Sequence, residues 1–273
     1  KSLFLRNYRD ISPTVQKDLA QKFNNFFIDT KTYSHDNKKF SPDKKLKIGY
    51  ISPDFRNHAV ANFVLPFIKD YDSRNFSVVC YQTGKKDSVT DKLKRNKITW
   101  RDLSGRNTKT SARIIFEDNI DILVDLSGHS QNNCMQIMAL KPAPIQISGI
   151  GYTATTGLNA IDFFLSDKVC MPEESSASFT EKIIRLENCL CYAPGVVRDI
   201  PPAGINAPVM KNDFVTFGSF NNFAKVSDEV LQAWRAILEQ VEDSVLVIKS
   251  KICSIEQGRE IVRERLNKTN PET

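Results

Sequence analysis

Leu46-Lys-Ile-Gly-Tyr-Ile-Ser-Pro-Asp-Phe-Arg-Asn-His58 begins as an apolar run and ends with titratable side chains. The run from Leu46 to Ile51 predicts a short buried strand that ends at Ser52-Pro53. In an open α/β sheet, ligands bind outside the carboxyl ends of the strands. Asp54 and His58 are therefore expected at the mouth of a cleft, where a histidine can exchange protons near neutral pH.

The spacing of Asp54 and His58 allows two interpretations. The two side chains form a carboxylate–imidazole pair, in which Asp54 orients the ring or favours its charged form. Alternatively, His58 is an ordinary surface histidine. The residues alone leave both interpretations open.

Apolar runs alternate with helical or irregular stretches throughout residues 46–192. Continuous apolar strands separated by helices favour a parallel sheet that is covered on both faces. We therefore predict an α/β, doubly wound, Rossmann-like domain over this range. Its expected strands are 46–51, 76–82, 120–126, 144–148, 161–166 and 183–186, and its expected helices are 59–71, 87–96, 109–118 and 131–140.

The flanking parts of the chain differ in composition. Residues 1–45 predict a helical segment, with a helix over 12–28 that starts at Ser12-Pro13, followed by a lysine-rich linker. Residues 193–213 are dense in proline and glycine, which marks an inter-domain linker. The remainder, 214–273, predicts the incomplete beginning of a second Rossmann-like domain, so we expect a piece of a longer protein. Its strands are expected at 214–218 and 244–249, and its helices at 227–240 and 254–267.

The composition argues against several functional classes. Lys and Arg number 38 against 32 Asp and Glu, for a net charge of +6. The basic runs fall in surface turns, so we predict no nucleic-acid partner, although a mild positive field favours a phosphate-bearing ligand. The chain shows neither a long apolar run nor a signal sequence, which predicts no membrane association and a cytoplasmic location, or a nucleocytoplasmic one in a eukaryote. The six cysteines show no CxxC spacing, so reduced thiols are expected rather than a metal site or disulfides.

A second histidine follows a second predicted strand. Asp125-Leu-Ser-Gly-His129 closes the run that begins at Ile120. Ser127-Gly128 permits a tight turn, which would present His129 at the same sheet edge as His58. The other interpretation is that His129 caps a helix starting near Asn132.

Two further segments suggest contacts to a ligand. Backbone amides in the small-residue loop 150–157 could face a phosphate or a sugar, although it has neither a Walker nor a GxGxxG pattern. Lys225 stands just before a helix capped by Ser227, where a lysine opposes the helix dipole unless an anion lies between them. A lysine directed at a diphosphate would stabilise the charge on the leaving group. The alternative is an exposed lysine with no such role.

Taken together, these segments resemble the catalytic region of the SPINDLY / O-GlcNAc transferase family, glycosyltransferase family 41. The resemblance covers about residues 46–250, and the helix at 12–28 is similar to the segment that joins the family's tetratricopeptide repeats to its catalytic part. It implies a GT-B fold, with sugar transfer from a nucleotide diphosphate donor to Ser or Thr of protein acceptors. The matching stretches are 48–58, 120–129, 141–146, 151–157 and 216–225.

The resemblance also implies roles for individual residues. Carried over by position, Asp54 and His58 are active-site residues and Lys225 contacts the donor diphosphate. No metal and no cofactor are expected, since the family uses a lysine and a helix dipole, and the nucleotide sugar is a substrate. Donor- or substrate-binding residues are expected at His129, Ile150, Gly151, Tyr152, Asn221, Asn222 and Lys225.

One departure from the family pattern bears on activity. Thr153 and Ala154 stand where the family usually has proline and glycine. This favours an alternative in which the chain is an inactive homologue that binds peptide or nucleotide; a GT-B enzyme acting on small molecules, such as a sugar-nucleotide epimerase, is a third hypothesis. With its second domain incomplete, we expect this chain alone to be inactive. The donor sugar, GlcNAc or fucose, and the oligomeric state are not predicted.

Overall fold

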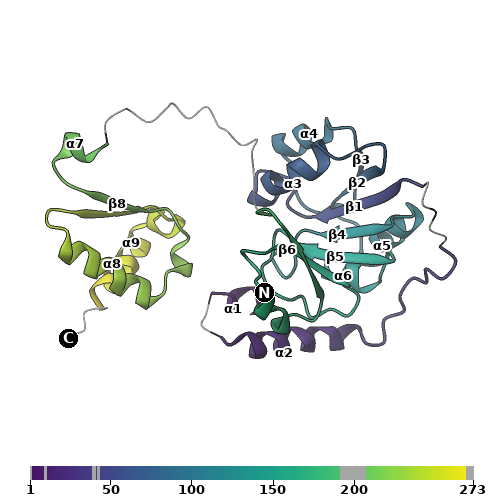
Figure 1. The fold of residues 1–273 in the computed structure, drawn as a ribbon, viewed down its shortest axis with the longest axis horizontal. Coiled ribbons are helices and arrows are strands. Elements are labelled where there is room, and N and C mark those ends of the chain that lie inside the picture. The colour runs from purple at the N-terminus through teal and green to yellow at the C-terminus, as the bar shows by residue number, and fades with distance from the viewer. Residues whose placement is uncertain (1, 9–10, 39–40, 42–43, 191–206, 269–273) are drawn as a thin grey trace. The chain divides into compact units, whose positions relative to one another are not determined.

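The computed structural model describes residues 2–8, 11–38, 41, 44–190 and 207–268 (Figure 1). The chain forms two compact units, Lys1–Arg198 and Asp199–Thr273. Most of the predicted linker 193–213 falls outside the described residues.

The first unit is built on a seven-stranded parallel sheet with the order β3-β2-β1-β4-β5-β6-β7. The chain adds β2 and β3 on one side of β1, then returns to place β4 on the other side. This reversal makes a topological switch point between β1 and β4, where ligands bind in open α/β sheets. The strands are β1 Leu46–Ser52, β2 Phe76–Gln82, β3 Thr99–Asp102, β4 Ile122–Asp125, β5 Ile145–Gly149, β6 Phe163–Asp167 and β7 Lys182–Leu186.

Both faces of this sheet are buried, as the continuous apolar runs predicted. Neighbouring strand residues point to opposite faces, so Tyr50 joins one apolar cluster and Ile51 joins the other. Helices α3 and α4 contribute to the cluster around Tyr50, and α5 and α6 contribute to the cluster around Ile51. The helical elements are α1 Ser2–Arg6, α2 Pro13–Asn24, η1 Asn25–Phe27, α3 Ala59–Lys69, α4 Ser88–Lys94, α5 Thr108–Glu117, α6 Met135–Ala139 and η2 Glu173–Ser178.

Three expectations differ from the structure in detail. The sequence did not predict β3, because this edge strand has only four residues and no apolar run. The helix expected at 131–140 shrinks to α6, since residues 130–134 form the turn that follows β4. Part of the lysine-rich segment that follows α2, predicted as a linker, packs on the rest of the first unit: the Tyr33 ring stacks on Phe116 with centroids 4.4 Å apart.

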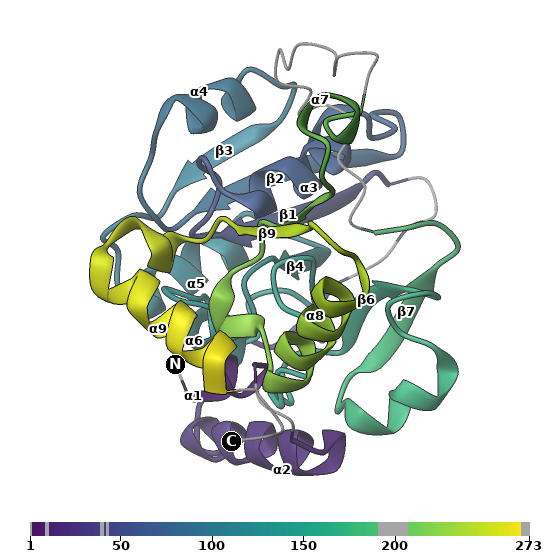
Figure 2. The same cartoon turned by 90° about the vertical axis from the view of Figure 1, so that its left-hand side faces the viewer.

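The second unit follows the expected β-α-β-α order. Parallel strands β8 and β9 pair side by side, and helices α8 and α9 contact each other (Figure 2). Leu231 of α8 and Val262 of α9 are buried together in a small apolar cluster. The elements are α7 Val209–Asn212, β8 Thr216–Ser219, η3 Phe223–Lys225, α8 Asp228–Gln240, β9 Val245–Ile248, η4 Lys251–Ser254 and α9 Glu256–Lys268. None of the helices in the described ranges combines the length and apolar character needed to span a bilayer.

Candidate active site

A pocket of about 430 Å³ opens at the switch point of the first unit. The loop after β1 and the turn after β4 both contribute to it, so His58 and His129 meet there as the sequence predicted. The sequence did not point to the apolar wall supplied by α1. The lining residues are Phe4, Leu5, Asp54, Arg56, His58, His129, Ser130, Gln131, Asn132 and Gly151.

Asp54 and His58 lie close together without a hydrogen bond. His58 Nδ1 is 3.9 Å from Asp54 Oδ2, whereas Arg56 donates to Asp54 Oδ1 at 2.9 Å. The backbone N–H of Val60 donates to His58 Nδ1 at 3.3 Å, so the imidazole is the N-cap of α3. The predicted pair is thus an electrostatic contact that matters only when the ring is protonated. Because Nδ1 accepts, the neutral ring carries its proton on Nε2.

His129 is buried beside the pocket and does not cap a helix. Helix α6 begins at Met135 with Cys134 as its N-cap, so the capping interpretation is wrong. His129 Nε2 is 2.6 Å from the carbonyl oxygen of Thr156, and since a carbonyl only accepts, Nε2 is the protonated nitrogen. Burial lowers the pKa of His129 below its ordinary value. His129 is therefore a neutral, fixed part of the wall.

Asp125 holds the turn that carries His129. Its carboxylate is fully buried and accepts from the Ser127 hydroxyl at 2.6 Å, the Gly128 N–H at 2.7 Å and the Ser148 hydroxyl at 2.9 Å. Burial raises the pKa of Asp125, and the hydrogen bonds oppose that rise. Asp125 precedes Ser127 by two residues and Gly128 by three, a spacing at which an aspartate commonly bonds to a turn. The sequence interpretation missed this signal.

The loop after β5 reaches the pocket through Gly151. A Cβ at Gly151 would lie 2.0 Å from the carbonyl oxygen of Leu126, so only glycine fits there. Ile150 has φ +68°, and the Gly151 N–H donates to Gly149 O at 2.8 Å, which closes a γ-turn around a β-branched residue. Such a conformation is strained, and strain of this kind gathers at functional sites.

The side chains of Ile150 and Tyr152 face protein rather than the pocket. Ile150 packs on the apolar cluster around Tyr50, and Tyr152 is buried against the edge of His129 with ring centroids 5.5 Å apart. Burial raises the pKa of Tyr152 to about 12, against a hydrogen bond with Asn7. Of the predicted loop residues in the described chain, Gly151 is therefore the one that lines the pocket.

Glu181 fixes the second half of this loop, and sequence reasoning missed it. The buried carboxylate accepts from the Thr155 hydroxyl at 2.7 Å, from the Thr156 N–H at 2.8 Å, and from the Thr156 hydroxyl. Nothing in the local sequence pairs Glu181 with residues so far away along the chain. These bonds hold the Thr156 carbonyl in place for His129.

Three predicted residues belong to the second unit and are placed only within it. The Asn222 side chain accepts from the Ala224 N–H at 3.2 Å, and Asn221 Oδ1 accepts from the Asn222 N–H at 2.9 Å. Lys225 ends η3, two residues before Ser227, the N-cap of α8. The lysine thus stands before a helix N-terminus, as the sequence predicted.

The sequence of the chain matches a known protein family. The model of glycosyl transferase family 41 matches residues 13–192. The chain belongs to this family. The resemblance seen in the sequence motifs is thereby confirmed.

Relatives within family 41 extend the match beyond the first unit. The chain is 42% identical over 226 residues to a probable UDP-N-acetylglucosamine–peptide N-acetylglucosaminyltransferase SPINDLY of Arabidopsis thaliana, covering 80% of this chain and 24% of the relative. The tomato (Solanum lycopersicum) SPINDLY is 40% identical with the same coverage. The chain therefore spans about a quarter of the length of these relatives.

A solved structure supports the predicted GT-B fold class. A mutant O-GlcNAc transferase of Thermobaculum terrenum matches with a TM-score of 0.87 at 27% identity, covering 97% of this chain and 50% of that one. Within the described ranges, no group of three or more His, Cys, Asp and Glu side chains lies together in a way that could hold a metal ion.

Proposed function

We propose that this family 41 chain serves a protein O-glycosyltransferase, which moves a sugar from a nucleotide diphosphate donor to Ser or Thr hydroxyls of protein acceptors. The observation that carries the proposal is the convergence of His58, His129 and Gly151 on one pocket at the switch point of the sheet. In the reaction, the acceptor oxygen bonds to the anomeric carbon of the sugar as the bond to the diphosphate breaks. The hydroxyl proton leaves with a base or with the phosphate.

His58 supplies a hydrogen-bond donor in this proposal. Its Nδ1 is occupied by the Val60 N–H, so the neutral ring offers Nε2–H to an oxygen of the donor or acceptor. Such a donor stabilises negative charge that develops in the transition state. A role as general base would require the ring to release the helix cap or change its tautomer.

Lys225 supplies positive charge for the departing diphosphate. The lysine precedes the N-terminus of α8, where backbone N–H groups and the helix dipole also attract anions. Together they provide the electrostatic stabilisation that we propose in place of a metal ion. The names of the SPINDLY relatives favour UDP-GlcNAc as the donor and peptides as acceptors, with GDP-fucose as the other candidate.

The test compares variants of the full-length protein. Wild type, Lys225→Ala and Lys211→Ala are incubated with a protein acceptor and either UDP-GlcNAc or GDP-fucose, and the acceptor mass is measured over time. Lys211 is an exposed lysine of the same unit, so it controls for loss of one positive charge. We expect one donor to add its sugar mass, and Lys225→Ala to slow transfer by about 100-fold or more.

Two outcomes would contradict the proposal. Equal transfer rates for Lys225→Ala and Lys211→Ala would show that Lys225 has no specific role in the reaction. Tight binding of a nucleotide sugar without transfer by the wild type would support instead the inactive homologue that binds nucleotide or peptide. The melting temperature in the presence of each nucleotide sugar measures that binding, because a ligand of the native state raises it.

A further inference from the structure

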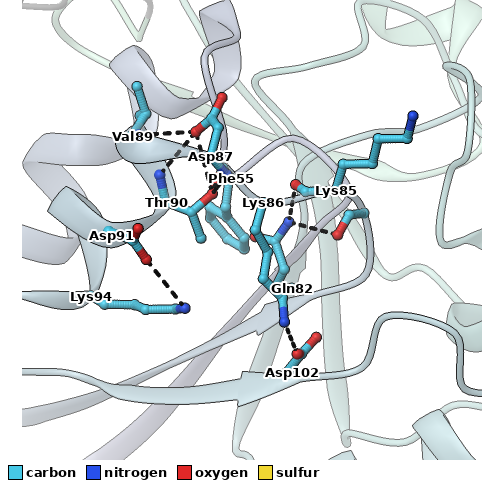
Figure 3. A network of polar contacts seen from close by, with 11 residues as sticks. Phe55, Gln82, Lys85, Lys86, Asp87, Val89, Thr90, Asp91, Lys94 and Asp102 are labelled. Carbon is cyan, nitrogen blue, oxygen red and sulfur yellow. Dashed lines mark hydrogen bonds and ion pairs between the residues drawn. The ribbon is translucent and has the colours of Figure 1, made fainter.

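The loop between β1 and α3, residues 53–58, carries three of the polar side chains that line the pocket. Asp54, Arg56 and His58 all depend on its backbone for their positions. The loop is not stabilised by a ladder of strand pairing, so its middle backbone groups need partners from elsewhere. Those partners are the side chains of Asp87, the N-cap of α4, and Thr90 in the first turn of α4. Figure 3 shows Asp87 and Thr90 beside Phe55 of the loop.

The two carboxylate oxygens of Asp87 accept hydrogen bonds from two different segments, the first turn of α4 and the loop. Oδ1 accepts from the N–H groups of Val89 at 2.9 Å and Thr90 at 3.2 Å, which caps α4. Oδ2 accepts from the N–H of Asn57 at 2.7 Å. One aspartate therefore ties the first turn of α4 to the residue immediately before His58.

Thr90 makes the second tie. Its hydroxyl donates to the carbonyl oxygen of Phe55 at 2.6 Å and accepts from the Asp87 N–H at 3.0 Å. Both Thr90 and Phe55 are fully buried. The capping box of α4, formed by Asp87 and Thr90, is thus also a clamp on the loop. It bonds to Phe55 and Asn57, the two residues on either side of Arg56.

The two segments also pack directly against each other. A Cβ at Gly84 would lie 2.1 Å from the carbonyl oxygen of Pro53, so the backbones touch where the loop begins. The clamp residues do not line the pocket described above. Any effect they have on a bound substrate must therefore pass through the loop.

From these contacts we infer that Asp87 and Thr90 are positioning residues, which set the backbone of residues 54–58 and so place Arg56 and His58 in the pocket. The effect on turnover rests on the proposed glycosyltransferase function, whereas the effect on the loop does not. A displacement of about 1 Å in a catalytic group can cost on the order of 100-fold in rate.

Asparagine at position 87 separates the two roles of the aspartate. Asparagine caps helices as well as aspartate does, so its oxygen can keep the two bonds to Val89 and Thr90. Its amide nitrogen then faces the Asn57 N–H, and two donors cannot bond. Asp87→Asn should therefore keep α4 and release the loop.

Asp91 provides a matched control. It lies in the first turn of the same helix and pairs with Lys94 at 3.7 Å, without a bond to the loop. Asp91→Asn removes the same charge from the same helix end. At position 90, Thr90→Val keeps the shape without the hydroxyl, and Thr90→Ser keeps the hydroxyl.

The experiment measures kcat, KM for the donor and amide hydrogen exchange at residues 53–58 in the full-length protein. We expect Asp87→Asn and Thr90→Val to lower kcat by about 10- to 100-fold with a smaller change in KM, and to speed exchange of the Asn57 N–H. Asp91→Asn and Thr90→Ser should stay within about twofold of wild type, because Asp91 makes no bond to the loop and serine keeps the hydroxyl that bonds to Phe55.

The readouts keep two failures apart. Exchange in Asp87→Asn and Thr90→Val equal to that in Asp91→Asn would overturn the clamp whatever the enzyme does. Faster exchange with unchanged kcat would overturn the positioning role. A wild type that transfers no sugar, with faster exchange in both clamp variants, would refute the proposed function and leave the clamp on the loop established.

Discussion

The backbone N–H of Val60 donates a hydrogen bond to the imidazole Nδ1 of His58 at 3.3 Å, which makes a pocket histidine the N-cap of a helix. The ring is therefore held by the first turn of α3, and its rotation is restricted. Because the ring both caps α3 and lines the pocket, a substitution of His58 affects helix stability and pocket chemistry together. The two effects can be separated by the choice of replacement.

Asparagine at position 58 should keep the helix and remove the pocket function. Asn is among the best N-cap residues, whereas loss of the cap in His58→Ala should cost about 1 kcal/mol of stability. Both variants lack the imidazole Nε2–H, so we expect turnover to fall about 100-fold in each. Chemical denaturation and kcat measured on the same samples test this. Wild-type turnover in His58→Asn would exclude a role for the ring in transfer.

Gly128 should tolerate no side chain. It has φ +48°, and a Cβ there would lie 2.3 Å from Tyr152 Cβ. Backbone strain and the clash together should make Gly128→Ala destabilising by about 3 kcal/mol or more. Gly105 has φ +76° with no neighbour within 4 Å, so Gly105→Ala should cost only the backbone strain of about 1–2 kcal/mol.

Urea denaturation of the two glycine variants gives the comparison directly. The difference between them isolates the contact of Gly128 with Tyr152 from the cost of a left-handed backbone. Equal free energies of unfolding would show that Tyr152 moves aside, and that the side chains around His129 rearrange at little cost in free energy.

The sequence predicted the sheet well because its signal is local. Apolar runs such as 46–51 and 76–82 are buried on both faces, and the loops that follow strand ends meet at one edge by topology alone. This is why Asp54, His58 and His129 could be placed near one another without a structure. Edge strand β3, Thr99–Asp102, lacks that signal since its residues are mostly exposed.

The parts that sequence reasoning missed depend on contacts between distant residues. Glu181 bonds Thr155 and Thr156 across a separation of about 25 residues, and Asp87 bonds Asn57 across 30. Phe4 and Leu5 reach the pocket from α1, at the start of the first unit and far from the other lining residues in the sequence. No periodicity or turn signal encodes such pairs. Even for Asp54 and His58, nothing in the sequence indicated that Asp54 Oδ1 would accept from Arg56 or that His58 Nδ1 would accept from the N-terminus of a helix.

The departure at Ala154 should not by itself abolish activity. Among the described residues with positive φ, neither Thr153 nor Ala154 appears, so this loop does not use the conformational freedom of the family's glycine. Ala154→Gly should then leave kcat unchanged and lower stability by about 0.5–1 kcal/mol, because glycine gains entropy in the unfolded chain. Kinetics with the preferred donor and a urea titration test both parts. A tenfold gain in kcat would mean that alanine restricts the loop.

His129 should make stability depend on pH in the mildly acidic range. Burial lowers its pKa in the folded protein from the ordinary 6.5, whereas the unfolded chain regains the ordinary value. Between the two pKa values the unfolded state binds a proton that the native state does not, so the free energy of unfolding falls as pH drops below about 6.5, with a slope approaching about 1.4 kcal/mol per pH unit. The loss is complete once the pH is below the folded pKa.

His129→Gln should flatten that part of the profile. The glutamine amide can still donate to the Thr156 carbonyl, yet it does not titrate. Urea midpoints measured from pH 8 to pH 5 should therefore run parallel for the two proteins above about pH 7 and converge as the pH falls, because only the wild type loses stability through this ring. Parallel profiles across the whole range would show that the folded protein binds a proton at His129 as readily as the unfolded chain does, which would contradict the lowered pKa of this ring.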